Sequence, residues 1–241
     1  GWDVPSVRGK YNYKRISFEY FRDNTVAREA VKKGIVSYRN EGVAKDWMTS
    51  YRGFPALEDG AFVRELAERR NITAMASAIV INTRRERFKD PKVREALLYA
   101  YDFDWINRVQ HFGFYRRVDS FFDNSALEAT GIPTGRELEL LEEFRGEIPD
   151  EVFTRPFVIP RSDGKGLNRA NMLKAQQLLS EAGWNVVDGK LLNAEGEHFA
   201  FEFLSRNPAE ERSALPFIAA LKRLGIDASV RTADPTQYRS R

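Results

Sequence analysis

The sequence predicts an α/β fold, in which helices pack on a sheet of parallel strands. Two segments support this prediction, because residues 15–39 read as strand, helix and strand, and residues 198–232 repeat that order. A helix between two strands returns the chain to the starting edge, so the two strands pair in parallel. With 241 residues, 42% of them hydrophobic, the chain is long enough for one large domain or two small ones.

The first strand–helix–strand unit is marked by a change of period. Apolar residues alternate over 16–20, which predicts a strand, and a helical pattern follows. Asn24 or Thr25 is expected to cap this helix and Gly34 to end it, with a second strand over 35–39. The expected buried face of the helix comprises Ala27, Ala30 and Val31.

The next third of the chain carries a short helix, an extended run and two further helices. A helix is expected at 43–50, and the small and apolar residues of 74–82 predict a fully buried strand. Asp90 precedes a proline and predicts a helix over 91–101, and Asp104 is expected to cap a second one. The buried face of that second helix is expected to contain Trp105, Ile106 and Val109.

Residues 113–168 contain many prolines and glycines, and only one short helix is expected there, at 136–144. A segment this long and irregular is usually functional or wraps another part of the protein. Helical periodicity returns at 169–182, with Asn168 as the expected cap and Gly183 as the expected end.

The last part of the chain predicts a hairpin and the second strand–helix–strand unit. Asp188 and Gly189 stand between apolar pairs, which is a strong signal for a two-residue hairpin turn. Strands are expected at 198–204 and 226–232, with a helix at 209–224 between them. One face of this helix is expected to carry Leu215, Ile218, Leu221 and Leu224.

Composition and motifs argue against several functions. The 38 basic and 35 acidic residues nearly cancel, which is untypical of a nucleic-acid-binding protein. His111 and His198 lack the spacing of a metal site, and no nucleophile elbow or cysteine occurs. The run 163–168 resembles a phosphate loop but lacks its spacing, so it predicts a turn and a helix cap. A small α/β hydrolase stays open only as a remote alternative.

Residues 81–107, INTRRERFKDPKVREALLYAYDFDWIN, resemble the signature of the family-5 extracellular solute-binding proteins, the dipeptide and oligopeptide receptors of ABC importers. The flanking runs TVAREAVKKGIVSYR and NRANMLKAQQLLSEAGW resemble further segments of that family, and its oligopeptide and microcin C receptor branch is the most similar. The matching positions are Ile81, Asn82, Phe88, Asp90, Val93, Arg94, Ala96, Leu97, Ala100 and Asp102.

The resemblance implies a periplasmic-binding-protein-like two-lobed fold of type II, cluster C, of which this chain holds parts of both lobes. Residues 1–78 would belong to lobe I and 79–241 to lobe II, entered through a hinge strand at 74–82. Because such receptors are more than twice as long, we expect the chain to be an internal fragment. We also expect the isolated fragment to bind ligand weakly or not at all.

The resemblance also implies where solute binds. The hinge strand would deliver an Arg-rich corner to the cleft, where guanidinium groups can hold a peptide carboxylate; the alternative is that these arginines are solvated loop charges. A family carboxylate near the cleft is absent from Gly34–Ser37. The candidate ligand-binding residues are Asn82, Thr83, Arg84, Arg85, Tyr115, Arg117, Asp119, Ser120, Phe121, Asn40 and Glu41.

The implied function is that of the periplasmic component of an ABC importer, which binds oligopeptides or peptide-like compounds and delivers them to the membrane permease. No catalysis, metal, cofactor or nucleic-acid partner is expected, and a monomer is expected. A receptor of the same fold for a sugar, an opine or a nickel chelate is the alternative.

Overall fold

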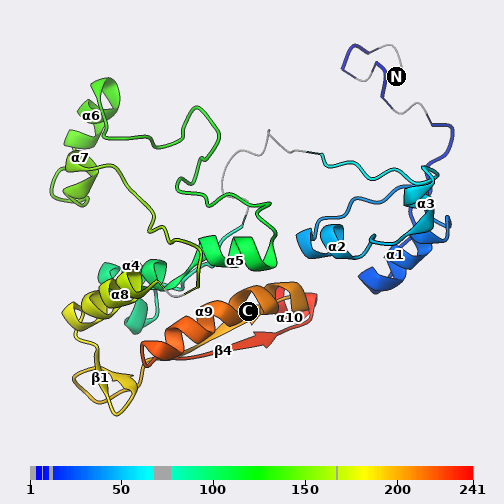
Figure 1. Ribbon diagram of the computed structural model, residues 1–241. Helices are drawn as coiled ribbons and strands as arrows, with labels where there is room; N and C mark the ends of the chain where they lie inside the picture. The colour runs from blue at the N-terminus through cyan, green and yellow to red at the C-terminus, as the bar shows by residue number, and fades with distance from the viewer. Residues whose placement is uncertain (1–3, 7, 11–12, 68–76, 167, 241) are drawn as a thin grey trace. The chain divides into compact units, whose positions relative to one another are not determined.

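The computed structural model describes residues 4–6, 8–10, 13–67, 77–166 and 168–240 (Figure 1). Its contacts divide the chain into two compact units, Gly1–Leu66 and Ala67–Arg241, which are called unit 1 and unit 2 below. Each unit is described separately. The expected boundary at 78/79 between two lobes is not decided by this division, and the lobe assignment stays a prediction.

The described part of unit 1 contains three short helices, α1 (Asn24–Lys32), α2 (Ala44–Thr49) and α3 (Pro55–Glu58). The expected helix at 43–50 is therefore confirmed, as is the buried face of α1. The expected cap of α1 was wrong, because the carboxylate of Asp23 accepts hydrogen bonds from the amides of Thr25 and Val26. An aspartate one position earlier reaches the same unpaired amides.

The two strands expected in unit 1 are absent from the described residues. Segments 16–20 and 35–39 have no regular structure, and the alternating side chains of the first segment face solvent, with Phe18 75% and Tyr20 91% exposed. Alternation predicts a strand only where a second strand supplies backbone partners and a buried face. No strand runs beside either segment in residues 13–66, so the alternating side chains form no strand there.

The first part of unit 2 is mainly helical. Asp90 caps α4 as expected, and α5 is capped by Asp102, whose carboxylate accepts from the amide of Trp105. The expectation that Asp104 caps α5 was therefore wrong. The helices of this part are η1 (Glu86–Phe88), α4 (Pro91–Ala100), α5 (Phe103–Gln110), α6 (Gly135–Glu142), α7 (Glu151–Thr154) and α8 (Arg169–Glu181).

The remainder of unit 2 carries the strands. The antiparallel hairpin of β1 (Asn185–Val187) and β2 (Lys190–Leu192) turns at Asp188 and Gly189, both with positive φ, as the Asp-Gly pair predicts. Strands β3 (Ala200–Ser205) and β4 (Asp227–Thr232) pair in parallel through the intervening α9 (Pro208–Arg223), which confirms the predicted strand–helix–strand unit. Asp234 caps the terminal α10 (Pro235–Arg239).

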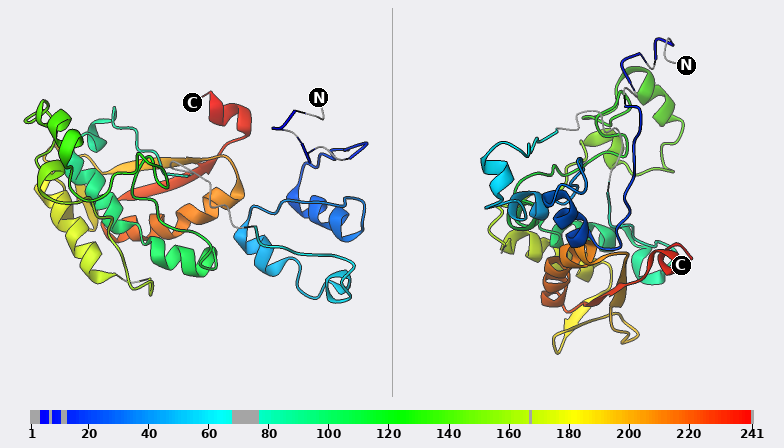
Figure 2. Two further views of the ribbon diagram at one scale, coloured as in Figure 1. Left: turned by 90° about the horizontal axis from the view of Figure 1, so that it is seen from above. Right: turned by 90° about the vertical axis from the view of Figure 1, so that its right-hand side faces the viewer.

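The core of unit 2 lies between α4 and α8, which pack side by side, and the β3–β4 pair, which α9 follows along its length (Figures 1 and 2). Phe199 is fully buried and contacts the rings of Phe88, Trp184 and Phe201 edge-on. The other buried members are Val93, Ala96, Leu97, Ala100, Ala175, Leu178, Leu179, Leu191, Phe217, Leu221, Leu224 and Ile226.

Gly225 joins the end of α9 to the hairpin. Its φ is +80°, and its carbonyl accepts a hydrogen bond of 2.8 Å from the amide of Leu191. A Cβ at this position would lie 2.7 Å from that same nitrogen, so only glycine permits this backbone contact.

Three further expectations about burial were wrong. Residues 77–80 of the expected buried strand are exposed and irregular. Residues 74–76, which were expected to begin this strand, lie outside the described residues. Val109 and Leu215 are each 49% exposed, whereas Ile106 on α5 is buried as expected and Phe217 on α9, which was not expected there, is buried as well. On a helix, side chains of adjacent turns compete for one contact face, and packing decides which of them is buried.

Candidate functional site

The Arg-rich corner of the chain is an exposed turn in unit 2. The side chain of Asn82 accepts a hydrogen bond from the amide of Arg84, and its carbonyl accepts one from the amide of Arg85. Thr83, Arg84 and Arg85 are exposed. Asn82 thus shapes the turn through its own side chain, and the two guanidinium groups are free to meet a solute carboxylate.

Arg87 behaves differently from the two arginines before it. Its guanidinium donates to the carbonyl of Ala200 at the start of β3, and the side chain is half-buried. This contact ties η1 to the sheet. The view of the cluster as solvated loop charges therefore fails for Arg87, which anchors the turn.

A second group of candidate residues lies in the loop between α5 and α6. The side-chain amide of Asn107 on α5 donates to the carbonyl of Tyr115 at 2.6 Å and accepts from its backbone amide at 3.1 Å. His111 contacts the Tyr115 ring edge-on at 4.8 Å, and burial lowers the pKa of His111 below its ordinary value. Tyr115 stays 45% exposed, so α5 holds its backbone while the ring faces outward.

Arg117 is the buried member of the loop. It is 8% exposed, donates to the carbonyl of Pro160 at 2.6 Å and lies over the Tyr101 ring, 5.7 Å from its centroid. Burial lowers the pKa of Arg117 and raises the pKa of Tyr101. An arginine stays charged in such surroundings, so Arg117 brings a fixed positive charge under the loop.

Asp119, Ser120 and Phe121 complete this loop with different roles. Ser120 is buried, and its hydroxyl oxygen accepts hydrogen bonds of 3.2 Å from the amides of Phe122 and Ala129. Asp119 is exposed, and Phe121 is 76% exposed. Ser120 therefore builds the loop, and its two neighbours present a carboxylate and an aromatic surface to solvent.

A polar junction that the sequence did not reveal joins the start of α5 to the segment before α8. The hydroxyl of Ser162 donates to the Asp102 carboxylate at 2.5 Å, and the amide of Ser162 donates to Asp104 at 2.8 Å. Arg161 lies 3.4 Å from the same Asp104. The spacing of the two aspartates was visible, but their common partner lies about 60 residues away, and no local signal indicates it.

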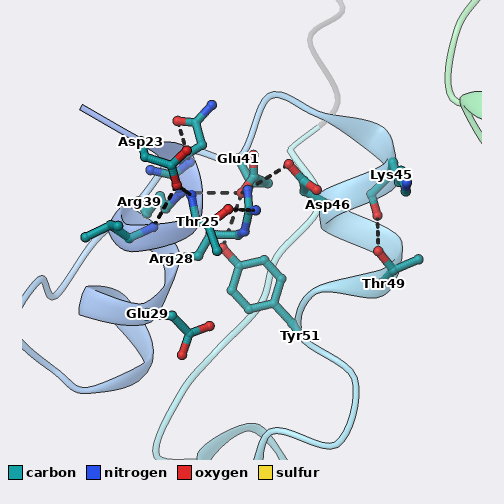
Figure 3. Close-up of polar contacts among 12 residues, drawn as sticks. Asp23, Thr25, Arg28, Glu29, Arg39, Glu41, Lys45, Asp46, Thr49 and Tyr51 are labelled. Atoms are coloured by element: carbon teal, nitrogen blue, oxygen red, sulfur yellow. Dashed lines mark hydrogen bonds and ion pairs between the residues drawn. The ribbon is translucent and has the colours of Figure 1, made fainter. Parts of the chain in front are cut away.

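In unit 1 the candidate Glu41 belongs to a network of charged groups (Figure 3). Its carboxylate is 4% exposed and lies 3.4 Å from Arg39 and 3.9 Å from Arg28. The hydroxyl of Tyr51 donates to it at 3.4 Å, and burial, followed by the charge of Glu41, raises the pKa of Tyr51. Asn40 is exposed. Within its unit, Glu41 is engaged by protein groups, whereas Asn40 is accessible.

Arg28 is the central cation of this network and was not among the candidates. It donates to Asp46 at 2.7 Å and to the Thr25 hydroxyl at 3.2 Å, so α1 and α2 are joined through one guanidinium (Figure 3). The only sequence signal is an arginine between the apolar positions of α1. Trp47 is half-buried, with the Arg64 guanidinium 4.7 Å from its ring centroid.

The structure thus places the candidates in three groups. Residues 82–85 form one turn, residues 115–121 form one loop, and residues 40–41 belong to unit 1. In the described part of unit 2 no hydrogen bond or ion pair joins the turn to the loop. Of the 163–168 run, the described residues 163–166 turn the chain, with the carboxylate of Asp163 accepting from the amide of Lys165, and Asn168 caps α8, as expected. His198 contacts the Gly225 carbonyl at 3.0 Å, which is a structural role.

Comparison with protein families decides the class of protein. The family model described as "Bacterial extracellular solute-binding proteins, family 5 Middle" matches residues 2–241. The chain belongs to this family. It is a family of solute-binding proteins, not of enzymes, and the resemblance stated for residues 81–107 is confirmed.

Individual relatives agree with the family. The "Probable peptide-binding protein YejA" of Agrobacterium fabrum is 39% identical over 245 residues, which cover 100% of this chain and 39% of that protein. The chain therefore spans about two fifths of the length of such curated relatives.

Two solved structures show the fold. The oligopeptide-binding protein AppA of Bacillus subtilis, in complex with a nonapeptide, matches with a TM-score of 0.56 at 20% identity, over 90% of this chain and 36% of that one. NikZ of Campylobacter jejuni, in complex with Ni(L-His), matches with a TM-score of 0.60 at 17% identity, over the same shares. Both confirm the expected mixed α/β, partial periplasmic-binding-protein fold. Among the described residues, no helix is long and apolar enough to cross a membrane.

Proposed function

We propose that this chain is part of a periplasmic receptor that binds oligopeptides or peptide-like compounds and delivers them to the permease of an ABC importer. The family match over residues 2–241 carries the proposal. Its finer part, a peptide ligand, is supported by the 39% identity to a relative that is called a probable peptide-binding protein. Residues 1–78 are assigned to lobe I and residues 79–241 to lobe II, with solute enclosed between the two.

The exposed arginines and aromatic rings of unit 2 suit the carboxylate and the apolar side chains of a peptide. Arg84 and Arg85 present exposed guanidinium groups on a turn shaped by Asn82, and such groups bind carboxylates in bidentate fashion. Tyr115 and Phe121 present exposed aromatic surface on a loop held by Asn107 and Ser120. Arginine for the charge and aromatic rings for apolar side chains are typical of sites that accept varied peptides.

The roles within this site differ. Asn82, Ser120 and Arg117 use their polar groups to hold the backbone, so we propose that they position the site. Thr83, Arg84, Arg85, Tyr115, Asp119 and Phe121 are proposed to face solute. In unit 1, Asn40 is proposed to face solute and Glu41 to hold the surrounding network.

The proposal is tested with the protein encoded by the full reading frame around these residues. Thermal unfolding is measured with a set of tripeptides to pentapeptides, with mannose oligosaccharides, with an opine and with nickel–histidine. A ligand that binds only the folded protein at 100 times its Kd stabilises it by about 2.7 kcal/mol, so binding shifts the melting temperature by several degrees. We expect a shift with peptides; a shift only with one of the other compounds would overturn the peptide assignment.

The arginine turn is tested in the same assay. Changing Arg84 and Arg85 together to Gln should weaken binding of a free peptide on the order of tenfold, and binding of the same peptide amidated at its C-terminus should change little. The matched control is Arg136→Gln together with Arg155→Gln on α6 and next to α7, which removes the same charge from another exposed part of unit 2. Equal losses for the two forms of the peptide would contradict a carboxylate-binding role.

A further inference from the structure

Three carboxylates gather in the loop that follows α5. Oxygen atoms of Asp119, Asp123 and Glu128 all lie within 4.8 Å of one another. Asp119 is exposed, Glu128 is half-buried and Asp123 is 4% exposed, so the group extends from the surface into the loop. Opposite ligands around Ca²⁺ are about 5 Å apart, twice the metal–oxygen distance, so this spacing fits one coordination sphere.

A buried oxygen inside this group lacks a donor. Asp123 Oδ2 accepts from the Arg116 guanidinium at 2.5 Å, whereas Asp123 Oδ1 is buried and has no hydrogen-bond partner. A carboxylate oxygen that is removed from water without a partner is costly. This oxygen is therefore positioned to receive a group that the described residues do not supply.

A second buried carboxylate oxygen without a partner, on Asp102, has different surroundings from that on Asp123. Asp102 Oδ2 also lacks a hydrogen-bond partner, but the charge of the buried Arg117 acts on Asp102. Near Asp123, in contrast, lie two more carboxylates, those of Asp119 and Glu128. In the described residues one cation, Arg116, pairs with this group, which leaves two negative charges uncompensated.

The loop holds two of the three acids, Asp123 and Glu128, in place by contacts of its own. The backbone amide of Asn124 donates to Glu128 Oε2 at 2.7 Å, and Ser120 fixes the loop through its bonds to Phe122 and Ala129. Glu128 thus keeps its other oxygen for a ligand. The three carboxylates offer only oxygen ligands, which hard cations prefer. In Asp123 and Glu128 one oxygen of the carboxylate is directed by a protein contact.

We propose that Asp119, Asp123 and Glu128 bind a calcium ion. The ion accepts Asp123 Oδ1 and one oxygen from each of the other two carboxylates, and water and backbone carbonyls complete its six to eight ligands. Its two charges balance those that Arg116 leaves uncompensated. The bound ion braces the loop that carries Tyr115 and Phe121.

The test uses the full-length protein dialysed against a chelator. Thermal unfolding and titration calorimetry are measured with CaCl2, with MgCl2 and with NaCl at equal ionic strength. We expect saturable calcium binding and a melting temperature raised by several degrees, with magnesium much less effective because it demands smaller octahedral geometry. Equal shifts with all three salts, or no heat of calcium binding, would overturn the proposal.

Variants separate the site from a general charge effect. Asp119→Asn removes an exposed ligand without touching the Arg116 pair, and should weaken calcium affinity on the order of tenfold or more while leaving the melting temperature without calcium unchanged or raised. Glu128→Gln should weaken calcium in the same way. Glu137→Gln on α6 is the matched control and should leave affinity unchanged. Calcium affinity that is equal in all three variants would show that the cluster is not the site.

Discussion

Unit 1 and unit 2 bury different kinds of side chain. The core of unit 2 joins large apolar residues from α4, α8, α9 and both strand pairs, with Phe199 and Leu179 fully buried. The buried apolar residues of unit 1 are mostly small, and beside them lies the charged network around Arg28 and Glu41. Apolar packing tolerates small shifts, whereas paired charges need exact partners; unit 2 should therefore unfold as one body and unit 1 should depend on single ionic contacts.

The largest expected effect is the loss of a core ring from unit 2. Changing Phe199 to Ala removes a fully buried ring that contacts Phe88, Trp184 and Phe201, and should lower the free energy of unfolding of unit 2 by about 3–5 kcal/mol. Urea unfolding measures this loss. Hydrogen exchange followed by mass spectrometry assigns it to peptides of α4, α8 and β3.

Phe121→Ala is the matched control for that change. This ring is 76% exposed, so its removal should alter stability by at most about 0.5 kcal/mol. If both substitutions cost the same, or if exchange in unit 1 accelerates as much as in unit 2, the apolar core would not be the feature that distinguishes the units.

The next effect breaks the ionic network of unit 1. Arg28→Met leaves Glu41 and Asp46 without their shared cation and should cost about 2 kcal/mol, less than for a fully enclosed pair because Asp46 is 23% exposed. Hydrogen exchange in peptides of α1 and α2 should accelerate, and that in unit 2 should not change.

Two variants sharpen this prediction. Arg22→Met removes an exposed arginine from the same unit and should leave exchange unchanged. Arg28→Met combined with Glu41→Met and Asp46→Leu replaces the whole network by apolar groups and should recover part of the loss. Failure of the triple variant to recover, with Arg22→Met silent, would show that the geometry of the ion pairs is not what α1 and α2 depend on.

A smaller effect is expected from the cap of α4. The carboxylate of Asp90 accepts from the amide of Lys92 at 2.7 Å, so Asp90→Ala should lower the stability of unit 2 by about 1 kcal/mol. Asp90→Asn keeps an acceptor and should retain most of it. Equal losses for Ala and Asn in urea unfolding would contradict a capping role.

The smallest expected effect is the loss of the α1 cap at low pH. Hydrogen bonds from the amides of Val26 and Thr25 lower the pKa of Asp23 from its ordinary value of 3.8. Because the folded pKa lies below the unfolded one, the cap contributes stability above about pH 4 and loses it as the pH falls through the folded value. A titration of the Thr25 and Val26 amides by NMR should show a midpoint below 3.8; a midpoint at or above that value would mean that the cap does not form.

Local signals predicted much of unit 2. Asn168 and Asp90 cap helices, and Asp188 with Gly189 turns the hairpin, because each of these contacts joins residues no more than a few positions apart. The parallel pairing of β3 and β4 followed from the order of elements, since a helix between strands permits few other arrangements. Family resemblance over residues 81–107 supplied the class of protein, which composition and periodicity did not.

The cap of α5 is a contact that local signals did not predict. Asp102 and Asp104 both have the chemistry of a cap, and the choice between them is linked to Ser162, which binds both carboxylates from a distant segment. The Arg28 network and the group of Asp119, Asp123 and Glu128 depend in the same way on loops folding back on themselves. Spacing along the chain does not reveal which charges meet.

The sequence by itself determined the longer helices, the caps of α4 and α8, the hairpin and the family, because these depend on neighbouring residues or on a recognisable run of side chains. Only the tertiary structure decided that the alternating residues 16–20 form no strand, that Val109 faces solvent, that Phe217 faces inward and Leu215 does not, and that Glu41 is buried among cations. The physical reason is that burial and charge pairing are properties of surfaces brought together, and each residue competes for them with partners far away in the chain.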